Sequence, residues 1–300
     1  MTDAPRRRAA ITAVGGYLPE DRLTNADLEK MVDTNDEWIR TRTGIVERRI
    51  LRDPDKATAY MATQAAQEAL DKRGMSAADV DVILVATVTP DMVFPATACI
   101  VQAELGASGA WGYDISAACS GFLYALTTGA SMIESGAAER VLVIGGDTMS
   151  RIIDYTDRAT CVIFGDGAGA VLLEANTEGY GVIDTVSYVD GSGAESLCMM
   201  AGGSLRPATH ETVDQRLHYA YQDGRTVFKR AVVGMADAAA EIMERNGLTG
   251  DDVDWLVPHQ ANLRIIDATA RRMDLPSEKV MLNIERYGNT TAGTLPLCLW

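Results

Sequence analysis

The sequence has few basic residues and no long hydrophobic stretch, and both shortages narrow the functions open to it. Its 27 Lys and Arg residues stand against 42 Asp and Glu residues, which gives a formal net charge of −15. An acidic chain repels the phosphate backbone of nucleic acids, so we expect no nucleic-acid partner. No apolar run approaches the ~20 residues of a membrane-spanning helix, so we expect no membrane partner.

Cysteine is scarce as well, and its spacing argues against disulfide and metal frameworks. The five cysteines form no CxxC pair and no disulfide pattern. We therefore expect a cytoplasmic protein with reduced thiols and no metal site. What is present is typical of a globular protein, because 47% of the 300 residues are apolar, enough for one large or two modest domains.

An internal repeat links the two halves of the chain. Residues 68–84 (EALDKRGMSAADVDVIL) align without gaps on residues 241–257 (EIMERNGLTGDDVDWLV), at an offset of 173. Each copy predicts a helix end, a glycine stop, a short turn and a buried strand. We interpret the repeat as a duplication, with residues 1–175 and 176–300 as the two halves.

Strands and helices are expected on both sides of the repeat. Hydrophobic patterns predict strands over 9–14, 80–87, 110–115, 140–145, 168–174, 254–257 and 280–284, and helices over 57–73, 94–105, 122–133, 227–246 and 262–273. Gly15 and Gly16 are expected to end the first strand. The segment GDGAGA (165–170) has the glycines of a dinucleotide loop, but strand-like residues follow it. We therefore expect a tight turn there and no NAD site.

Three polar residues follow predicted buried strands. Cys119 lies in the small-residue stretch ISAACSGF (115–122), His259 follows Pro258, and Asn289 follows the strand over 280–284. Ligands of open α/β sheets bind beyond the carboxyl ends of strands, and a pseudo-twofold pairing of the halves would bring these ends together. Taken alone, Cys119 is typical of a small buried residue, although the dipole of the following helix would favour its thiolate.

These residue types support two kinds of chemistry. A cysteine–histidine pair oriented by an amide performs hydrolysis in papain-like proteases. Alternatively, the cysteine carries an acyl group as a thioester, while histidine Nε2–H and an asparagine NH₂ stabilise the oxygen of an enolate during carbon–carbon bond formation. The hydrolytic alternative is the weaker one, because its cysteine would lie near the start of the chain.

Five segments carry a more specific signal than any single residue. They are DEWIRTRTGI (36–45), DISAACSGF (114–122), FGDGAGA (164–170), PHQANLRI (258–265) and YGNTTAG (287–293). In this order they resemble the β-ketoacyl-acyl-carrier-protein synthase III family of thiolase-fold condensing enzymes. The resemblance implies an α/β thiolase fold, in which two pseudo-symmetric αβαβα halves form a five-layered structure.

The resemblance also implies an activity, which is the condensation that initiates type II fatty-acid synthesis. Cys119 matches the nucleophile that takes an acetyl or other short acyl group from coenzyme A. His259 and Asn289 match the pair that promotes decarboxylation of malonyl-acyl carrier protein and stabilises the enolate. The product would be a 3-oxoacyl-carrier protein. The steps would be ping-pong, and no cofactor would be needed, since acyl-CoA is a substrate.

Further residues match the family's binding positions. Trp38 and Arg158 match the pair that sandwiches the adenine of coenzyme A, and Asn262 matches a residue of the pantetheine tunnel. Phe94 matches an aromatic side chain that reaches the partner's acyl pocket across a homodimer interface. The resemblance therefore implies both a coenzyme A site and a homodimer.

A basic patch is expected to receive the acidic carrier protein. Lys229 and Arg264 match family positions, and Arg271 and Arg272 lie near them in the sequence. A basic patch on an acidic protein would oppose the overall charge and so favour an acidic partner.

The C-terminal end departs from the family pattern. Family members continue beyond YGNT with the rest of a helix and two core strands, whose connecting loop supplies a second oxyanion donor. The resemblance therefore implies that this sequence lacks that end and that residues 176–300 form an incomplete half. Thr291 is a smaller departure, because serine is commoner there.

Alternatives within the superfamily remain open from the sequence. They are a starter-unit polyketide synthase, a long-chain condensing enzyme, a 3-hydroxy-3-methylglutaryl-type synthase, and an inactive truncated partner subunit. The adenine-sandwich pair and DEWIRTRTGI favour the priming synthase, and the retained Cys119 argues against an inactive partner.

Overall fold

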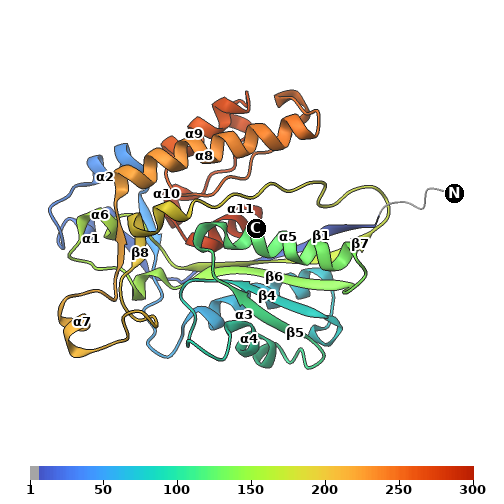
Figure 1. Ribbon diagram of the computed structural model, residues 1–300, viewed down its shortest axis with the longest axis horizontal. Coiled ribbons are helices and arrows are strands. Elements are labelled where there is room, and N and C mark those ends of the chain that lie inside the picture. Colours follow the sequence, from blue (N-terminus) through green and yellow to red (C-terminus); the bar gives the residue numbers. More distant parts are fainter. Residues whose placement is uncertain (1–6) are drawn as a thin grey trace.

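A mixed five-stranded sheet lies at the centre of the fold (Figure 1). The computed structural model describes residues 7–300. The strand order is β1–β7–β6–β4–β5, with β7 antiparallel to both β1 and β6, and with β6, β4 and β5 parallel. The strands are Arg8–Tyr17 (β1), Val82–Ala86 (β4), Trp111–Ile115 (β5), Arg140–Asp147 (β6) and Gly167–Asn176 (β7).

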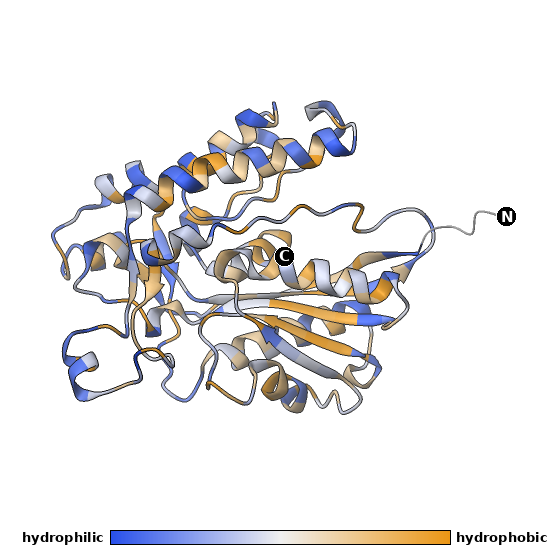
Figure 2. Cartoon of the chain, in the orientation of Figure 1, coloured by the Kyte–Doolittle hydropathy of each residue, from blue (hydrophilic) through white to orange (hydrophobic). Residues whose placement is uncertain are grey.

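Helices cover both faces of this sheet, which explains why its inner strands are apolar along most of their length (Figure 2). Helices α3 (Thr58–Arg73) and α4 (Thr97–Leu105) pack on one face. Helices α5 (Gly121–Glu134) and α11 (Thr294–Leu299) pack on the other. The helix predicted over 94–105 begins only at Thr97, so Phe94 lies in the preceding loop.

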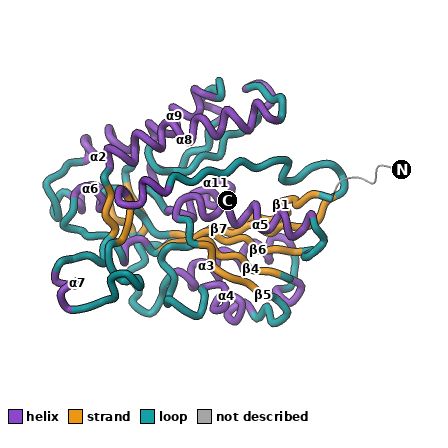
Figure 3. Tube along the Cα trace, viewed as in Figure 1, coloured by secondary structure: helices purple, strands orange, loops and turns teal. Residues whose placement is uncertain are grey.

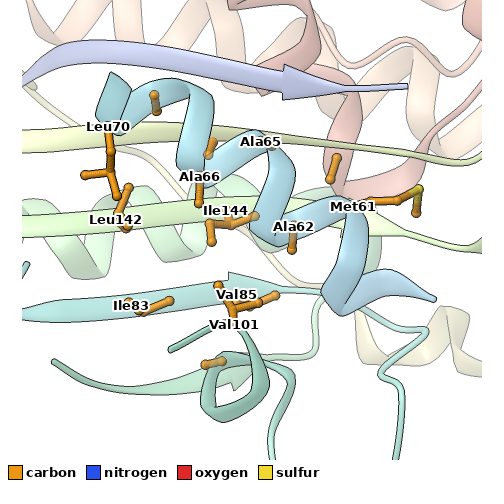
Figure 4. Packing of buried hydrophobic residues seen from close by; sticks show 14 of the residues in the cluster. Met61, Ala62, Ala65, Ala66, Leu70, Ile83, Val85, Val101, Leu142 and Ile144 are labelled. Atoms are coloured by element: carbon orange, nitrogen blue, oxygen red, sulfur yellow. The ribbon is translucent and has the colours of Figure 1, made fainter. Parts of the chain in front are cut away.

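Helix α3 presents alanines to the sheet and therefore lies very close to it (Figure 4). Ala62, Ala65 and Ala66 share its buried face. A Cβ atom at Gly15 would lie 2.1 Å from the carbonyl oxygen of Ala65, so β1 passes under the helix only because that position is glycine. The predicted break at Gly15 and Gly16 is wrong, since β1 continues to Tyr17.

The glycine-rich segment 165–170 likewise forms a contact surface. The tight turn expected there is wrong, because β7 begins at Gly167 and runs straight through the motif. A Cβ atom at Gly169 would lie 2.8 Å from the backbone carbon of Pro296 in α11. One at Gly145 of β6 would lie 2.2 Å from the carbonyl oxygen of Ala292. The glycines let the C-terminal segment lie directly on the strands.

The second half contributes an outer helical layer and very little sheet. Helices α8 (Gly224–Arg245) and α9 (Leu263–Arg272) pack against each other above α5 and α11 (Figure 1). The layer between them is mostly loop (Figure 3). The strands predicted over 254–257 and 280–284 reduce to one parallel bridge between Leu256 and Val280, and Ile284 begins α10 (Ile284–Tyr287). Two segments without further neighbours form at best a marginal pair.

The repeat found in the sequence is visible in the turns that follow both long helices. Gly74 after α3 and Gly247 after α8 both adopt left-handed conformations, with φ of 67° and 64°. A 3-10 turn follows each glycine, at Ala77–Asp79 and at Gly250–Asp252. The helix–glycine–turn unit is thus built twice, as the alignment predicted.

The same offset of 173 recurs at the second turn of each half. The 3-10 turns Ala118–Ser120 and Thr291–Gly293 precede α5 and α11, respectively. Ala118 and Thr291, equivalent by this offset, have φ of 46° and 53°. Non-glycine residues rarely adopt this region, so both turns store backbone strain.

Short elements complete the chain at the end of the sheet where β4, β5 and β6 finish. They are β2 (Arg22–Thr24), α1 (Asn25–Leu28), α2 (Asp36–Thr43), β3 (Glu47–Arg49), α6 (Arg158–Cys161), β8 (Leu197–Met199), α7 (His210–Asp214) and β9 (Ala220–Gln222). Within residues 7–300, no helix is both long enough and apolar enough to cross a bilayer.

Candidate active site

A cavity of about 720 Å³ lies between α5, α8 and the segment that leads into α9. Cys119, His259 and Asn289 all line it, and Asn262 lies on its wall. The structure therefore brings together three residues that lie up to 170 positions apart in the sequence. Apolar side chains of α8, including Phe228 and Met235, form much of the remaining surface.

Cys119 lies in the strained turn between β5 and α5. Burial raises the pKa of its thiol from 9.0 to about 12, and the nearby Asp147 carboxylate adds to the rise. A hydrogen bond from the Asn289 side chain opposes it. The sequence-based expectation that this position would favour the thiolate is therefore wrong, because burial and the Asp147 carboxylate raise the pKa of the thiol.

Asn289 is held on both sides by backbone groups. Its own N–H donates to the carbonyl of Ile163, and its carbonyl accepts from the N–H of Gly165, both at 3.0 Å. The side-chain Oδ1 accepts from the N–H of Thr291 at 2.9 Å. Because Oδ1 is engaged there, the NH₂ group is the end of the amide that faces the Cys119 thiol.

His259 is half-buried and electrically neutral at neutral pH. Burial lowers the pKa of its imidazole from 6.5 to about 4. Its Nδ1 lies 2.6 Å from the Oγ1 atom of Thr294, at the start of α11. The next residue, Gln260, is fully buried and accepts the backbone N–H groups of Asn283 and Ile284, each at 3.1 Å. These bonds fix the segment that carries the imidazole.

Asp147 is a buried carboxylate that sequence reasoning missed. It ends β6 and accepts hydrogen bonds from the hydroxyl groups of Thr87 and Thr89, at 2.9 and 3.0 Å. Its second oxygen accepts the N–H of Ala292 at 3.1 Å, which ties the turn after Asn289 to the sheet. Burial raises the pKa of Asp147 to about 6. Its position at the carboxyl end of a predicted buried strand was the available signal.

Trp38 and Arg158 lie together, as the resemblance implied. The guanidinium carbon of Arg158 is 5.1 Å from the centre of the Trp38 ring, and its Nη1 donates to the carbonyl of Asp33 at 2.9 Å. Neither residue lines the cavity, but Thr43 on the helix of Trp38 and Ala159 beside Arg158 do. The pair therefore lies next to the cavity wall.

Asn262 has a structural role in addition to its place on the cavity wall. Its side chain caps α9 by accepting the N–H of Arg264 at 3.0 Å. Its amide nitrogen donates to the carbonyl of Arg42 at 2.8 Å, which joins α9 to α2.

The predicted basic patch is partly engaged with other groups. Arg264 lies over the ring of Phe228, with the guanidinium carbon 4.7 Å from its centre. Arg272 lies 3.8 Å from a carboxylate oxygen of Asp237. Lys229 follows Phe228 on α8, so Lys229 and Arg264 come from adjoining helices.

Phe94 lies apart from the cavity. Its side chain is 83% exposed, next to the exposed Met92 and Val93. Across residues 7–300, no three His, Cys, Asp or Glu side chains are grouped so as to hold a metal ion.

Comparisons with known proteins agree with this geometry. Residues 113–191 match the family 3-oxoacyl-[acyl-carrier-protein] synthase III, and residues 243–300 match the C-terminal family of the same enzyme. The β-ketoacyl-[acyl-carrier-protein] synthase III of Chlorobium luteolum is 64% identical over 97% of this chain, which covers 89% of that protein.

Solved structures give the same result and support the predicted thiolase-type α/β fold. The 3-oxoacyl-[acyl-carrier-protein] synthase III of Aquifex aeolicus is 46% identical with a TM-score of 0.88, covering 97% of this chain and 89% of that one. A priming β-ketosynthase from the R1128 polyketide pathway is 36% identical with a TM-score of 0.89, covering 100% and 88%, respectively. This chain therefore belongs to the β-ketoacyl-[acyl-carrier-protein] synthase III family.

Proposed function

We propose that this chain condenses acetyl-CoA, or another short acyl-CoA, with malonyl-acyl carrier protein and so initiates fatty-acid synthesis. The observation that carries the proposal is the shared cavity of Cys119, His259 and Asn289. One nucleophile and two neutral hydrogen-bond donors are the groups that a thioester transfer followed by an enolate requires.

In the first step Cys119 takes the acyl group. Its sulfur forms a bond to the acyl carbonyl carbon, the bond from that carbon to the sulfur of coenzyme A breaks, and the thiol proton leaves with coenzyme A. The high pKa of the thiol means that it carries its proton at neutral pH, so this proton has to leave as the new carbon–sulfur bond forms.

In the second step the malonyl group replaces coenzyme A. Its carboxylate leaves as carbon dioxide, and the electron pair moves into a thioester enolate. We assign the enolate oxygen to His259 and Asn289, because both are neutral donors that line the same cavity as the thiol. The enolate carbon then attacks the carbonyl carbon of the acyl-cysteine, the carbon–sulfur bond breaks, and the departing thiolate of Cys119 takes a proton from solvent.

The binding residues are assigned from their placement. Trp38 and Arg158 would hold the adenine of coenzyme A, which needs about 7 Å between two stacking partners. The observed separation of 5.1 Å means that they must move apart by roughly 2 Å. Lys229 and Arg264, near the cavity residue Phe228, would receive the acidic carrier protein.

A homodimer would use the free edge of the sheet. Strand β5 has one neighbour in the sheet, and its Trp111 is 56% exposed. Exposed edges of this kind are pairing surfaces, and Phe94 lies exposed in the loop after β4. Sedimentation of the purified chain with and without Phe94→Asp tests the assembly, since a charge in the interface would shift it toward the monomer.

We also propose that residues 1–175 and 176–300 are the two duplicated halves. The equivalent strained turns at Ala118 and Thr291 support this division. The nucleophile would then belong to one half and the two enolate donors to the other.

The test follows the acyl group through both steps. Incubation with radiolabelled acetyl-CoA should label Cys119, and addition of malonyl-carrier protein should move the label into a 3-oxoacyl product. His259→Ala and Asn289→Ala should retain the labelling but lose ~10²–10³ in condensation rate.

Cys99→Ser is the matched control, because Cys99 is exposed and lies outside the cavity. It should retain both steps, whereas Cys119→Ser should lose the label. An unlabelled Cys119 in the unmodified chain would show that this proposal is wrong and would favour a non-catalytic partner subunit.

A polyketide starter synthase is the second candidate, supported by the similarity to the R1128 priming enzyme. Mass spectrometry of Cys119 after exposure to mixed acyl-CoAs separates the two, since each predicts a different acyl group on the thiol.

A further inference from the structure

We propose that Thr294 is a positioning residue that holds His259 in the tautomer with its proton on Nε2. This inference rests on the proposed function of His259 as an enolate-stabilising donor. It concerns the hydrogen bond between Thr294 Oγ1 and His259 Nδ1, which determines whether Nδ1 or Nε2 carries the proton of the imidazole.

The hydroxyl of Thr294 has a single proton to donate. Thr294 is 1% exposed, and its Oγ1 has two neighbours, His259 Nδ1 at 2.6 Å and the carbonyl oxygen of Thr291 at 3.2 Å. The hydroxyl can donate to only one of them. If it donated to Thr291, His259 would have to donate from Nδ1, and Nε2 would be bare.

The carbonyl of Thr291 keeps a hydrogen bond even when the hydroxyl of Thr294 turns to the imidazole. The carbonyl of Thr291 already accepts the main-chain N–H of Thr294, which closes the 3-10 turn. The imidazole Nδ1 is the nearer of the two groups to the hydroxyl oxygen. In the proposed arrangement the hydroxyl donates to Nδ1, so that the neutral ring carries its hydrogen on Nε2.

The same turn orients the second donor. The N–H of Thr291 holds Oδ1 of Asn289, so that the amide NH₂ faces Cys119. The turn Thr291–Gly293 thus orients both donors. Its backbone N–H holds the amide of Asn289, and Thr294, the residue that follows the turn, holds the imidazole of His259. Both N–H groups would then be available to the oxygen of an enolate, as the proposed function requires.

The tautomer can be observed without any reaction. The chain has three histidines, so ¹⁵N spectra of the imidazole nitrogens are simple to assign. In the unmodified protein at pH 7, His259 should show a protonated Nε2 and a bare Nδ1. Thr294→Val removes the hydroxyl at nearly constant shape and should give a mixture of tautomers, whereas Thr294→Ser should restore the single one.

The chain contains a matched control. His218 Nε2 lies 2.9 Å from Thr212 Oγ1, outside the cavity. Thr212→Val should change the His218 signals while leaving both the His259 spectrum and the condensation rate unaltered. Thr294→Val should do the reverse and leave the His218 signals in place, which also shows that the variant is folded.

Kinetics provide the second readout. Thr294→Val should slow decarboxylation of malonyl-carrier protein by ~10-fold to ~10²-fold, less than the complete loss of an oxyanion donor. Acylation of Cys119 by acetyl-CoA should change by less than about twofold, and Thr294→Ser should recover the decarboxylation rate.

Two results would overturn the inference. One is a His259 tautomer that is unchanged in Thr294→Val, and the other is a bare Nε2 in the unmodified protein. Both results come from spectra of the resting protein and do not depend on catalytic turnover. A chain with the expected tautomer but no condensation would instead contradict the proposed function.

Discussion

Alkylation of Cys119 by iodoacetamide should be slow at neutral pH and should accelerate about tenfold for each pH unit between 7 and 9. With a pKa of about 12, the thiolate is ~10⁻⁵ of the population at pH 7, against ~10⁻² for a thiol at the ordinary value of 9.0. A more basic thiolate is intrinsically more nucleophilic, which raises the rate constant of each thiolate by a factor of ~20. The net rate should be ~50-fold below that of an unperturbed thiol.

Peptide mass spectrometry resolves this rate residue by residue. Cys99 is exposed and serves as the reference within the same molecule, whereas Cys161 and Cys298 are buried and should react slowly. Asp147→Asn removes a negative charge that raises the pKa of Cys119, so it should increase alkylation of Cys119 at pH 7. The rate at Cys99 should stay constant in that variant.

The reasoning would be refuted by a Cys119 that reacts as fast as Cys99 at pH 7, with a rate that levels off below pH 9. That profile would mean that the dipole of α5 outweighs desolvation. The same result would also contradict the statement that the thiol carries its proton at neutral pH.

Three further outcomes are expected. Gly15→Ala should lower the free energy of unfolding by ~3 kcal/mol in urea titrations, because the added Cβ would strike the carbonyl of Ala65. Gly234→Ala is the control: it lies on the open surface of α8, where alanine favours the helix, and should raise the same free energy by ~0.5–1 kcal/mol. Trp38→Ala should raise KM for acetyl-CoA ~10-fold with kcat unchanged, since it removes a stacking partner outside the reacting cavity; an equal fall in kcat would contradict this. Lowering the pH from 6.5 to 4 should reduce the free energy of unfolding by up to ~3 kcal/mol through His259. Its pKa of about 4 in the folded chain lies below the ordinary value of 6.5, so the unfolded chain binds the proton first. The reduction should be smaller in His259→Asn.

The arrangement of the site was predictable because it follows from the repeat. The aligned copies indicated equivalent strand ends, and the structure indeed places Cys119, His259 and Asn289 around one cavity. The left-handed Ala118 and Thr291 confirm that the offset extends to the turns themselves. Local patterns also predicted α3 and its stop at Gly74, since periodicity and a left-handed glycine are properties of the segment alone.

The failures concern properties that depend on distant parts of the chain. The pKa of Cys119 is set by burial and by Asp147, neither of which the stretch 115–122 reveals. The strand over 280–284 needs partners on both sides, and only Leu256 pairs with it. Thr294 was missed because its significance depends on Nδ1 of a histidine 35 residues earlier.

The contact of α11 and its preceding turn with β6 and β7 has a mechanical consequence. A Cβ atom at Gly145 would lie 2.2 Å from the carbonyl oxygen of Ala292, and one at Gly169 would lie 2.7 Å from Cβ of Pro296. The depth at which the C-terminal segment lies on the sheet is therefore limited by the backbone of these two strands, which has no alternative rotamers. One added methyl group at either glycine would push this segment away from the strands. The two glycines thus fix how closely the turn that bonds Asn289 and His259 approaches the sheet.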